Sequence, residues 1–154
     1  MSSTVLFPHF PMYDFYIASR YRNKDSVLEL TQRIRAQGYS VYCFVESAPT
    51  IEHLGPVDGD AQEAMQKFEA LDWRTDRRVR EVFEADINAI HASRSVILLL
   101  PAGKSAHVEA GIAYGLGKPL ILIGEQKETE SLYLIFNQVH HSIITFLTSL
   151  PKKM

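Results

Sequence analysis

The stretch from residue 95 to residue 125, SVILLLPAGKSAHVEAGIAYGLGKPLILIGE, decides the fold of this chain. Two nearly continuous apolar runs, 95–101 and 120–125, enclose a segment with helical texture over 105–116. Strands that read as unbroken apolar runs are typical of parallel sheets covered on both faces. The stretch therefore predicts a strand, a helix and a second parallel strand joined by a right-handed crossover.

The rest of the chain repeats this alternation. It predicts one α/β domain over 1–154, a three-layer sandwich with a flavodoxin- or Rossmann-like parallel sheet of about five strands in the order 2-1-3-4-5. Residues 46–62 contain prolines and glycines but no Lys or Arg, and we expect a loop there, either a lid or a disordered segment. Further strands are expected at 12–19, 40–45 and 139–144, and further helices at 23–38, 61–71, 76–93 and 131–136.

Composition narrows the classes of function. The 154 residues carry 16 basic and 18 acidic side chains, a net charge of −2 that excludes non-specific binding of a nucleic-acid polymer as the main task. The single cysteine, Cys43, excludes an intrachain disulfide and a cysteine-rich zinc site. Adjacent His140 and His141 would point to opposite faces of a strand, so we expect no metal and no cofactor.

The same composition indicates a soluble protein. No apolar run approaches the ~20 residues of a membrane span. The first eleven residues, MSSTVLFPHFP, contain two prolines and no basic region, so they do not resemble a secretory signal. We therefore expect a cytoplasmic protein without a membrane partner.

The predicted strand order places a ligand site. In open parallel sheets, ligands bind at the carboxyl ends of the strands where the strand order reverses. Here that point lies between the first and third strands, so residues 19–23 and 101–109 are expected to line it. Gly103, Lys104 and Ser105 resemble the end of a phosphate-binding P-loop, but the glycine required five positions earlier is Leu98. The full P-loop is therefore excluded.

Two carboxylates stand where charge is costly. Asp86 falls within the apolar stripe of the helix predicted at 76–93, where it must be an ion-pair or capping partner or else catalytic. Glu109 lies in the first turn of the following helix, where the helix dipole alone could explain it. That short helix also contains Gly111 and Gly115, each costing ~1 kcal/mol relative to Ala. The two glycines indicate close approach of backbone or ligand, or packing of the helix on the sheet.

These residues resemble a known family. Tyr16-Ile-Ala-Ser-Arg-Tyr-Arg22 is similar to the Y-[IL]-A-G-P-Y-x-x segment of the nucleoside 2-deoxyribosyltransferase superfamily. Asp86, a strand, and then Glu109-Ala-Gly111-Ile-Ala113 through Gly117-Lys118-Pro119 are similar to its D…E-x-G-x-A-x-x-x-G-K-P pattern. The resemblance covers nearly the whole chain in the expected order.

The resemblance implies cleavage of an N-glycosidic bond without a cofactor. Glu109 would attack the anomeric carbon of the sugar, Tyr16 would orient Glu109, and Asp86 would help to protonate the departing base. Such a reaction needs a carboxylate on one face of the sugar and a proton donor near the leaving group. Of the two carboxyls, Asp86 on the apolar face is the candidate for a raised pKa. The resemblance also implies a homodimer or a larger homo-oligomer.

Departures from the family pattern alter the expected substrate. The transferases carry an aspartate six residues before the glutamate, and this chain has Gly103; the aspartate that commonly starts the third strand is Arg94. Ser19 and Arg20 replace a glycine and a proline.

These changes favour a bound phosphate, because guanidinium groups bind phosphate bidentately and helix N-terminal amides bind anions. Ser19, Arg20, Arg22, Gly103, Lys104 and Ser105 are the candidate substrate-binding residues, although Arg20 and Arg22 could equally be surface charges. Within the superfamily, the chain thus resembles most closely in type the 2′-deoxynucleoside 5′-phosphate N-hydrolases, and this resemblance implies hydrolysis of a (deoxy)nucleoside 5′-monophosphate. The alternatives are a deoxyribosyltransferase and a non-catalytic nucleotide-binding or signalling module.

Overall fold

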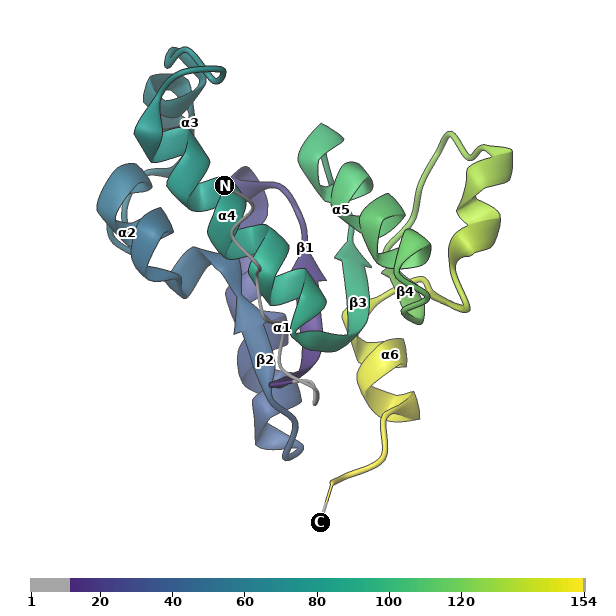
Figure 1. Ribbon diagram of the computed structural model, residues 1–154. Helices are drawn as coiled ribbons and strands as arrows, with labels where there is room; N and C mark the ends of the chain where they lie inside the picture. The colour runs from purple at the N-terminus through teal and green to yellow at the C-terminus, as the bar shows by residue number, and fades with distance from the viewer. Residues whose placement is uncertain (1–11, 154) are drawn as a thin grey trace.

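The computed structural model describes residues 12–153 and shows a five-stranded parallel sheet in the order β2-β1-β3-β4-β5 (Figure 1). This confirms the predicted fold class and strand order. Residues 1–11, on which the expectation about a secretory signal rests, lie outside the described part of the chain. The strands are β1 (Tyr13–Ala18), β2 (Val41–Cys43), β3 (Ser93–Leu99), β4 (Leu120–Ile123) and β5 (Gln138–His140).

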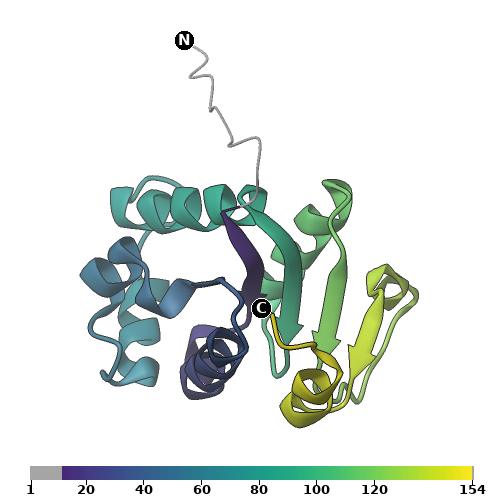
Figure 2. The same ribbon diagram turned by 90° about the horizontal axis from the view of Figure 1, so that it is seen from below.

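Helices cover both faces of the sheet, as crossover connections between parallel strands require. Figure 2 shows α1 (Lys24–Ala36) and α6 (Ile143–Ser149) on one face and α4 (Arg77–His91) and α5 (Lys104–Gly115) on the other. Two short helices, α2 (Ala48–Leu54) and α3 (Ala61–Glu69), lie beyond the β2 edge. Three 3-10 turns complete the described chain: η1 (Tyr21–Asn23), η2 (Phe44–Glu46) and η3 (Ser131–Ile135).

Side chains that alternate along each strand build two apolar cores. Ile17 and Ile97 point into the core under α1 and α6, whereas Val96 and Leu98 point into the core under α4 and α5. All four side chains are fully buried. The central strands therefore read as unbroken apolar runs because both of their faces are covered. Among residues 12–153, no helix is long and apolar enough to cross a membrane.

The expected loop at 46–62 is wrong over Ala48–Leu54, which forms α2. Ser47 caps this helix, because its Oγ accepts a hydrogen bond from the Thr50 N–H. Pro49 lies in the first turn, where a missing N–H costs nothing. The later part of the segment is also held, because the buried Lys24 ammonium donates to the Gly59 carbonyl. The segment is packed against the domain.

The structure also differs from the prediction near the C-terminal end, because a helix begins within the expected strand. The strand expected at 139–144 is the shorter β5, and Ile143 and Ile144 already belong to α6. A capping box between Ser142 and Thr145 starts that helix. A local side-chain cap thus ends the strand earlier than the apolar pattern indicates.

Lys118 joins the end of α4 to the start of β4. Its ammonium donates hydrogen bonds to the carbonyl oxygens of His91, at 3.1 Å, and Ser93, at 2.5 Å. Carbonyls at the carboxyl end of a helix lack partners within the helix, and the helix dipole favours a cation there. The Gly-Lys-Pro segment at 117–119 therefore has a structural role in this chain.

We predict that Lys118→Met lowers the free energy of unfolding by about 1.5–3 kcal/mol, because two carbonyls lose a charged donor. Urea denaturation measures the change. Lys127→Met, at an exposed lysine, is the control and should leave the stability within about 0.5 kcal/mol of the wild type. Equal stabilities for the two variants would contradict this role of Lys118.

Candidate active site

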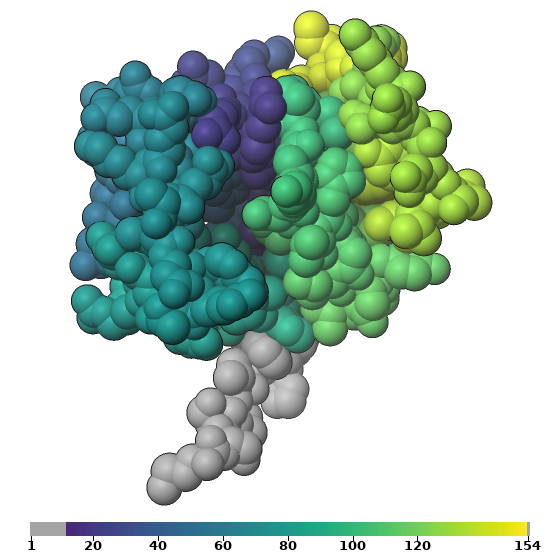
Figure 3. All heavy atoms as spheres, turned by 90° about the horizontal axis from the view of Figure 1, so that it is seen from above, coloured from purple at the N-terminus to yellow at the C-terminus, as the bar shows by residue number. Residues whose placement is uncertain are grey.

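The three residues that the sequence analysis makes catalytic come together between α4 and α5. Tyr16 comes from β1, Asp86 from α4 and Glu109 from α5. The fully buried Tyr16 donates its hydroxyl hydrogen bond to Oε2 of Glu109. Figure 3 shows the molecule hollowed between the teal surface of residues about 60–90 and the green surface of α5. Tyr16 and Glu109 thus connect β1 to the helix that follows β3, the two strands between which the strand order reverses.

The site raises the pKa of both carboxyls. Burial raises the pKa of Asp86 to about 7. Burial, with the nearby charge of Asp86, raises the pKa of Glu109 to about 8, although the hydrogen bond from Tyr16 acts in the opposite direction. From the sequence alone, only Asp86 is a candidate for a raised pKa. Because the two groups interact, they titrate as a pair.

Neither structural explanation for Asp86, an ion pair or a helix cap, holds in this structure. Its Oδ1 atom is buried and has no hydrogen-bond partner within residues 12–153. No ion pair joins it to another described residue, and the helix it belongs to is capped by Asp76. A buried polar atom without a partner in a native protein needs an explanation, and a bound ligand is one.

Tyr42 belongs to the same site and was missed by the sequence analysis. Its ring stacks on that of Tyr16 with centroids 5.4 Å apart and an angle of 9° between the planes. Its hydroxyl is buried and makes no hydrogen bond within the described part of the chain. A tyrosine in a strand usually serves packing. The position of Tyr42 in the site becomes clear only from its pairing with Tyr16 across β1 and β2.

The loop after β1 contains three of the predicted substrate-binding residues, Ser19, Arg20 and Arg22. The three differ in the contacts that they make. The Ser19 hydroxyl donates to the Leu99 carbonyl at 2.9 Å and accepts from Asn23 at 3.1 Å, so it ties β1 to β3. The Arg20 side chain is exposed and makes no hydrogen bond or ion pair to any residue in 12–153.

Arg22 is already occupied by α3. Its Nε donates to Oε1 of Gln62 at 2.6 Å, and its Nη1 and Nη2 lie 3.1 and 3.5 Å from the two carboxylate oxygens of Glu69. The carboxylate of Glu69 therefore occupies the Arg22 guanidinium, which the sequence makes a candidate for binding phosphate. Of the two arginines, only Arg20 is free to meet a ligand directly.

The amino end of α5 faces the Arg20 loop. Gly103 is the N-cap and provides no side-chain cap. The first turn contains no acidic residue, so the expectation that Glu109 lies in the first turn, where the helix dipole alone could explain it, is wrong. A Cβ atom at Gly103 would lie 3.9 Å from the Cβ of Arg20, so the two loops are neighbours. Lys104 and Ser105 follow on the exposed side. Uncapped amides beside an arginine and a lysine favour an anion.

Gly111 and Gly115 do not pack on the sheet. A Cβ atom at either position would have no heavy atom within 4 Å in the described structure, and both residues are exposed. Val108, on the same face of α5, is 61% exposed. Of the explanations left open by the sequence, helix–sheet packing is wrong, and the glycines leave a shallow face on the outside of α5.

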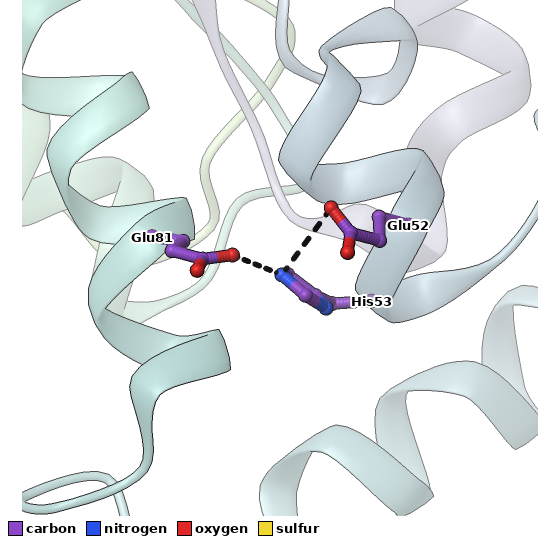
Figure 4. Close-up of side chains that lie close together, drawn as sticks. All are labelled: Glu52, His53 and Glu81. Carbon is purple, nitrogen blue, oxygen red and sulfur yellow. Dashed lines mark hydrogen bonds and ion pairs between the residues drawn. The ribbon is translucent and has the colours of Figure 1, made fainter.

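One group of metal-ligand side chains exists within residues 12–153, at the contact between α2 and α4 (Figure 4). The His53 Nε2 atom lies 2.5 Å from Oε2 of Glu81 and 3.9 Å from Oε2 of Glu52. Glu81 also pairs with Arg77 at 3.4 Å. Hydrogen bonds and ion pairs already engage His53 and Glu81, so the group serves to join α2 to α4.

A separate cavity of about 230 Å³ lies on the other face of the sheet, near α6. Its lining contains no ionisable side chain, so it offers no acid or base. Its lining residues are Phe15, Ser95, Pro119, Leu120, Ile121, Asn137, Gln138, Phe146, Ser149, Leu150 and Pro151.

Comparison with known proteins supports the fold. No protein-family model matches the chain, and a search of curated proteins finds no match. The solved structure of a 2-deoxyribosyltransferase from Bacillus psychrosaccharolyticus is similar, with a TM-score of 0.60 and 18% sequence identity. The similarity covers 90% of this chain and 96% of that chain. This chain therefore has the α/β fold of that protein over nearly its full length.

We predict that the stability of the protein falls as the pH rises from 5 to 8. The folded state keeps protons on Asp86 and Glu109 up to about pH 7 and 8, whereas the unfolded chain loses them near pH 4. Each unit of raised pKa is worth about 1.4 kcal/mol, so Asp86→Asn combined with Glu109→Gln should reduce the fall by at least about 2 kcal/mol. Urea denaturation at both pH values measures it. The control Glu128→Gln should leave the fall unchanged, and an unchanged fall in the double variant would contradict the burial of the pair.

Proposed function

We propose that the protein is an N-glycosidase that hydrolyses a (deoxy)nucleoside 5′-monophosphate to the free base and a sugar phosphate. The observation that carries the proposal is the Tyr16–Glu109 hydrogen bond beside the partly buried Asp86. The shared fold with a 2-deoxyribosyltransferase, a biocatalyst for nucleoside synthesis, supports the same class of substrate. Retaining glycosidases use a carboxylate nucleophile and a carboxylic acid in the same way.

The chemistry follows from the protonation of the pair. A carboxylate oxygen of Glu109 forms a bond to the anomeric carbon, while the bond from that carbon to the base nitrogen breaks and takes its electron pair to the base. Asp86 supplies the proton that neutralises the base. Water then attacks the anomeric carbon and gives a proton to Asp86, while the bond from that carbon to the Glu109 oxygen breaks and restores the carboxylate.

When Asp86 and Glu109 together carry one proton, only one of the two possible arrangements allows the reaction. Asp86 must be protonated and Glu109 ionised, and burial raises the pKa of both carboxyls. The Tyr16 hydroxyl favours the productive arrangement, because it donates to the ionised form of Glu109. Tyr16 is therefore the residue that prepares the nucleophile.

Arg20 and the amino end of α5 provide a place for the 5′-phosphate. The amides at residues 104–106 have no capping side chain, and Arg20 lies beside Gly103 without a competing partner among the described residues. A phosphate bound there gains hydrogen bonds from the amides and a bidentate guanidinium. Lys104 and Ser105 lie at the same helix end.

The transferase is the second candidate, because the similar solved structure is that of a 2-deoxyribosyltransferase. In that reaction, a second base would resolve the glycosyl ester in place of water.

The bare outer face of α5, with Gly111 and Gly115, also gives a second copy of the chain a surface on which to pack closely. A homodimer or larger homo-oligomer is therefore part of the proposal.

We predict that the wild type releases free base from a panel of nucleoside 5′-monophosphates without an acceptor base, as measured by chromatography. Glu109→Gln should lower kcat by at least about 10³-fold, because the nucleophile is lost. Glu84→Gln, an exposed carboxylate on α4, is the control and should keep the wild-type rate. Release that requires an added base would establish the transferase, and no release from any substrate would favour the non-catalytic module.

We predict that Arg20→Ala raises KM for the monophosphates by about tenfold or more and leaves KM for the matching nucleosides within about threefold. Arg22→Ala should have a smaller effect, because Glu69 and Gln62 already occupy its guanidinium. Steady-state kinetics on nucleotide and nucleoside pairs measures both variants. Equal effects of Arg20→Ala on the two substrate classes would overturn the phosphate site.

A further inference from the structure

His107 closes the first turn of α5 with its side chain. Its Nδ1 atom lies 2.8 Å from the carbonyl oxygen of Gly103, the N-cap residue. The main-chain N–H of His107 donates to the same oxygen at 3.3 Å, so the side-chain contact is the shorter of the two. A carbonyl oxygen only accepts hydrogen bonds, so Nδ1 carries a proton. The imidazole therefore fixes a turn whose N-cap residue has no side chain of its own.

Tyr133 holds the imidazole of His107 from its other side. The Tyr133 hydroxyl lies 2.9 Å from Nε2 of His107, and the two rings stack with centroids 5.9 Å apart and an angle of 15° between the planes. In the neutral ring with its proton on Nδ1, Nε2 is an acceptor, so the hydroxyl donates to it. Tyr133 belongs to η3 and packs against the core under α4 and α5. A hydrogen-bonded chain therefore runs from a core-packed residue through His107 to the Gly103 carbonyl.

The Gly103 carbonyl sets the direction of the amide that follows it. A peptide unit is planar and trans, so the Lys104 N–H points opposite to the Gly103 carbonyl. His107 holds that carbonyl on the helix side, so the Lys104 N–H points out of the amino end of α5, where Gly103 adjoins Arg20. Glycine has the freest backbone of all residues. Without the His107 contact, this peptide unit is free to turn its carbonyl, instead of its N–H, toward an anion.

These contacts give His107 a role in substrate binding. We propose that His107 is a positioning residue for phosphate recognition, because it holds the Gly103 carbonyl and so keeps the Lys104 N–H directed at the 5′-phosphate. This inference rests on the proposed function and adds to it a residue that acts through the backbone of Gly103. A nucleoside places no anion at that amide, so the effect of His107 is confined to nucleotides.

Two substitutions separate the hydrogen bond of His107 from its ring. His107→Phe keeps an aromatic ring against Tyr133 and removes the Nδ1 donor, whereas His107→Asn keeps an N–H donor near the position of Nδ1. Because one hydrogen bond is lost, His107→Phe should raise KM for the four common 2′-deoxynucleoside 5′-monophosphates about three- to tenfold. Their kcat, and KM for the matching nucleosides, should stay within about twofold of the wild type. His107→Asn should restore most of the nucleotide KM. His141→Phe, at an exposed histidine, is the control and should match the wild type.

A merely structural role of His107 gives a different result. It would raise KM equally for nucleotides and nucleosides, or leave His107→Asn as impaired as His107→Phe, and either outcome would overturn the proposal. Urea denaturation shows whether His107→Phe is folded.

Binding separates this proposal from the proposed reaction. The dissociation constants of the same nucleotides and nucleosides are measured by calorimetry in Glu109→Gln, with and without His107→Phe. A loss of affinity confined to the nucleotides supports the role of His107 even if the wild type releases no base. Unchanged nucleotide affinity in His107→Phe, beside normal turnover by the wild type, would overturn the role of His107 and leave the proposed function standing. No binding of any nucleotide would overturn it together with the phosphate site.

Discussion

The hydrogen bond from Tyr16 to Glu109 is the contact on which the candidate site depends. It joins the first strand of the sheet to α5 and holds a carboxyl group where burial makes its charge costly. Asp86 enters the same space from α4, and its charge raises the pKa of Glu109 further. Three separate elements must therefore be held close together, and the parallel sheet on which both helices pack provides that rigidity. The site is unusual because it contains two carboxyl groups that have few hydrogen-bond partners.

Much of this arrangement can be predicted from the sequence, because it follows from periodicity. The unbroken apolar runs at 95–101 and 120–125 become β3 and β4, since covered strands alternate between two apolar cores. Asp86 stands out because a carboxylate interrupts an apolar stripe of its helix. Both signals lie within one element, where spacing alone decides which side chains share a face.

The features that could not be predicted depend on contacts between distant segments. Tyr42 looks like a packing residue until its strand pairs with β1 and stacks it on Tyr16. The attachment of Arg22 to Glu69 cannot be seen before α3 is placed beside η1. Helix α2 was missed because Pro49 and neighbouring glycines indicate a loop, although a proline in the first turn is compatible with a helix. In each case a tertiary contact or a local cap decides the outcome.

The partners in the Tyr16–Glu109 bond are separated by 93 positions along the chain. Closing so long a loop costs conformational entropy that only the completed sheet and its helices repay. During synthesis, Tyr16 therefore leaves the ribosome long before its partner, and the first strand must wait for β3 and α5 before the carboxyl pair exists. Chemistry at this pair is thus coupled to completion of the fold, and a partly folded chain carries the residues without the site.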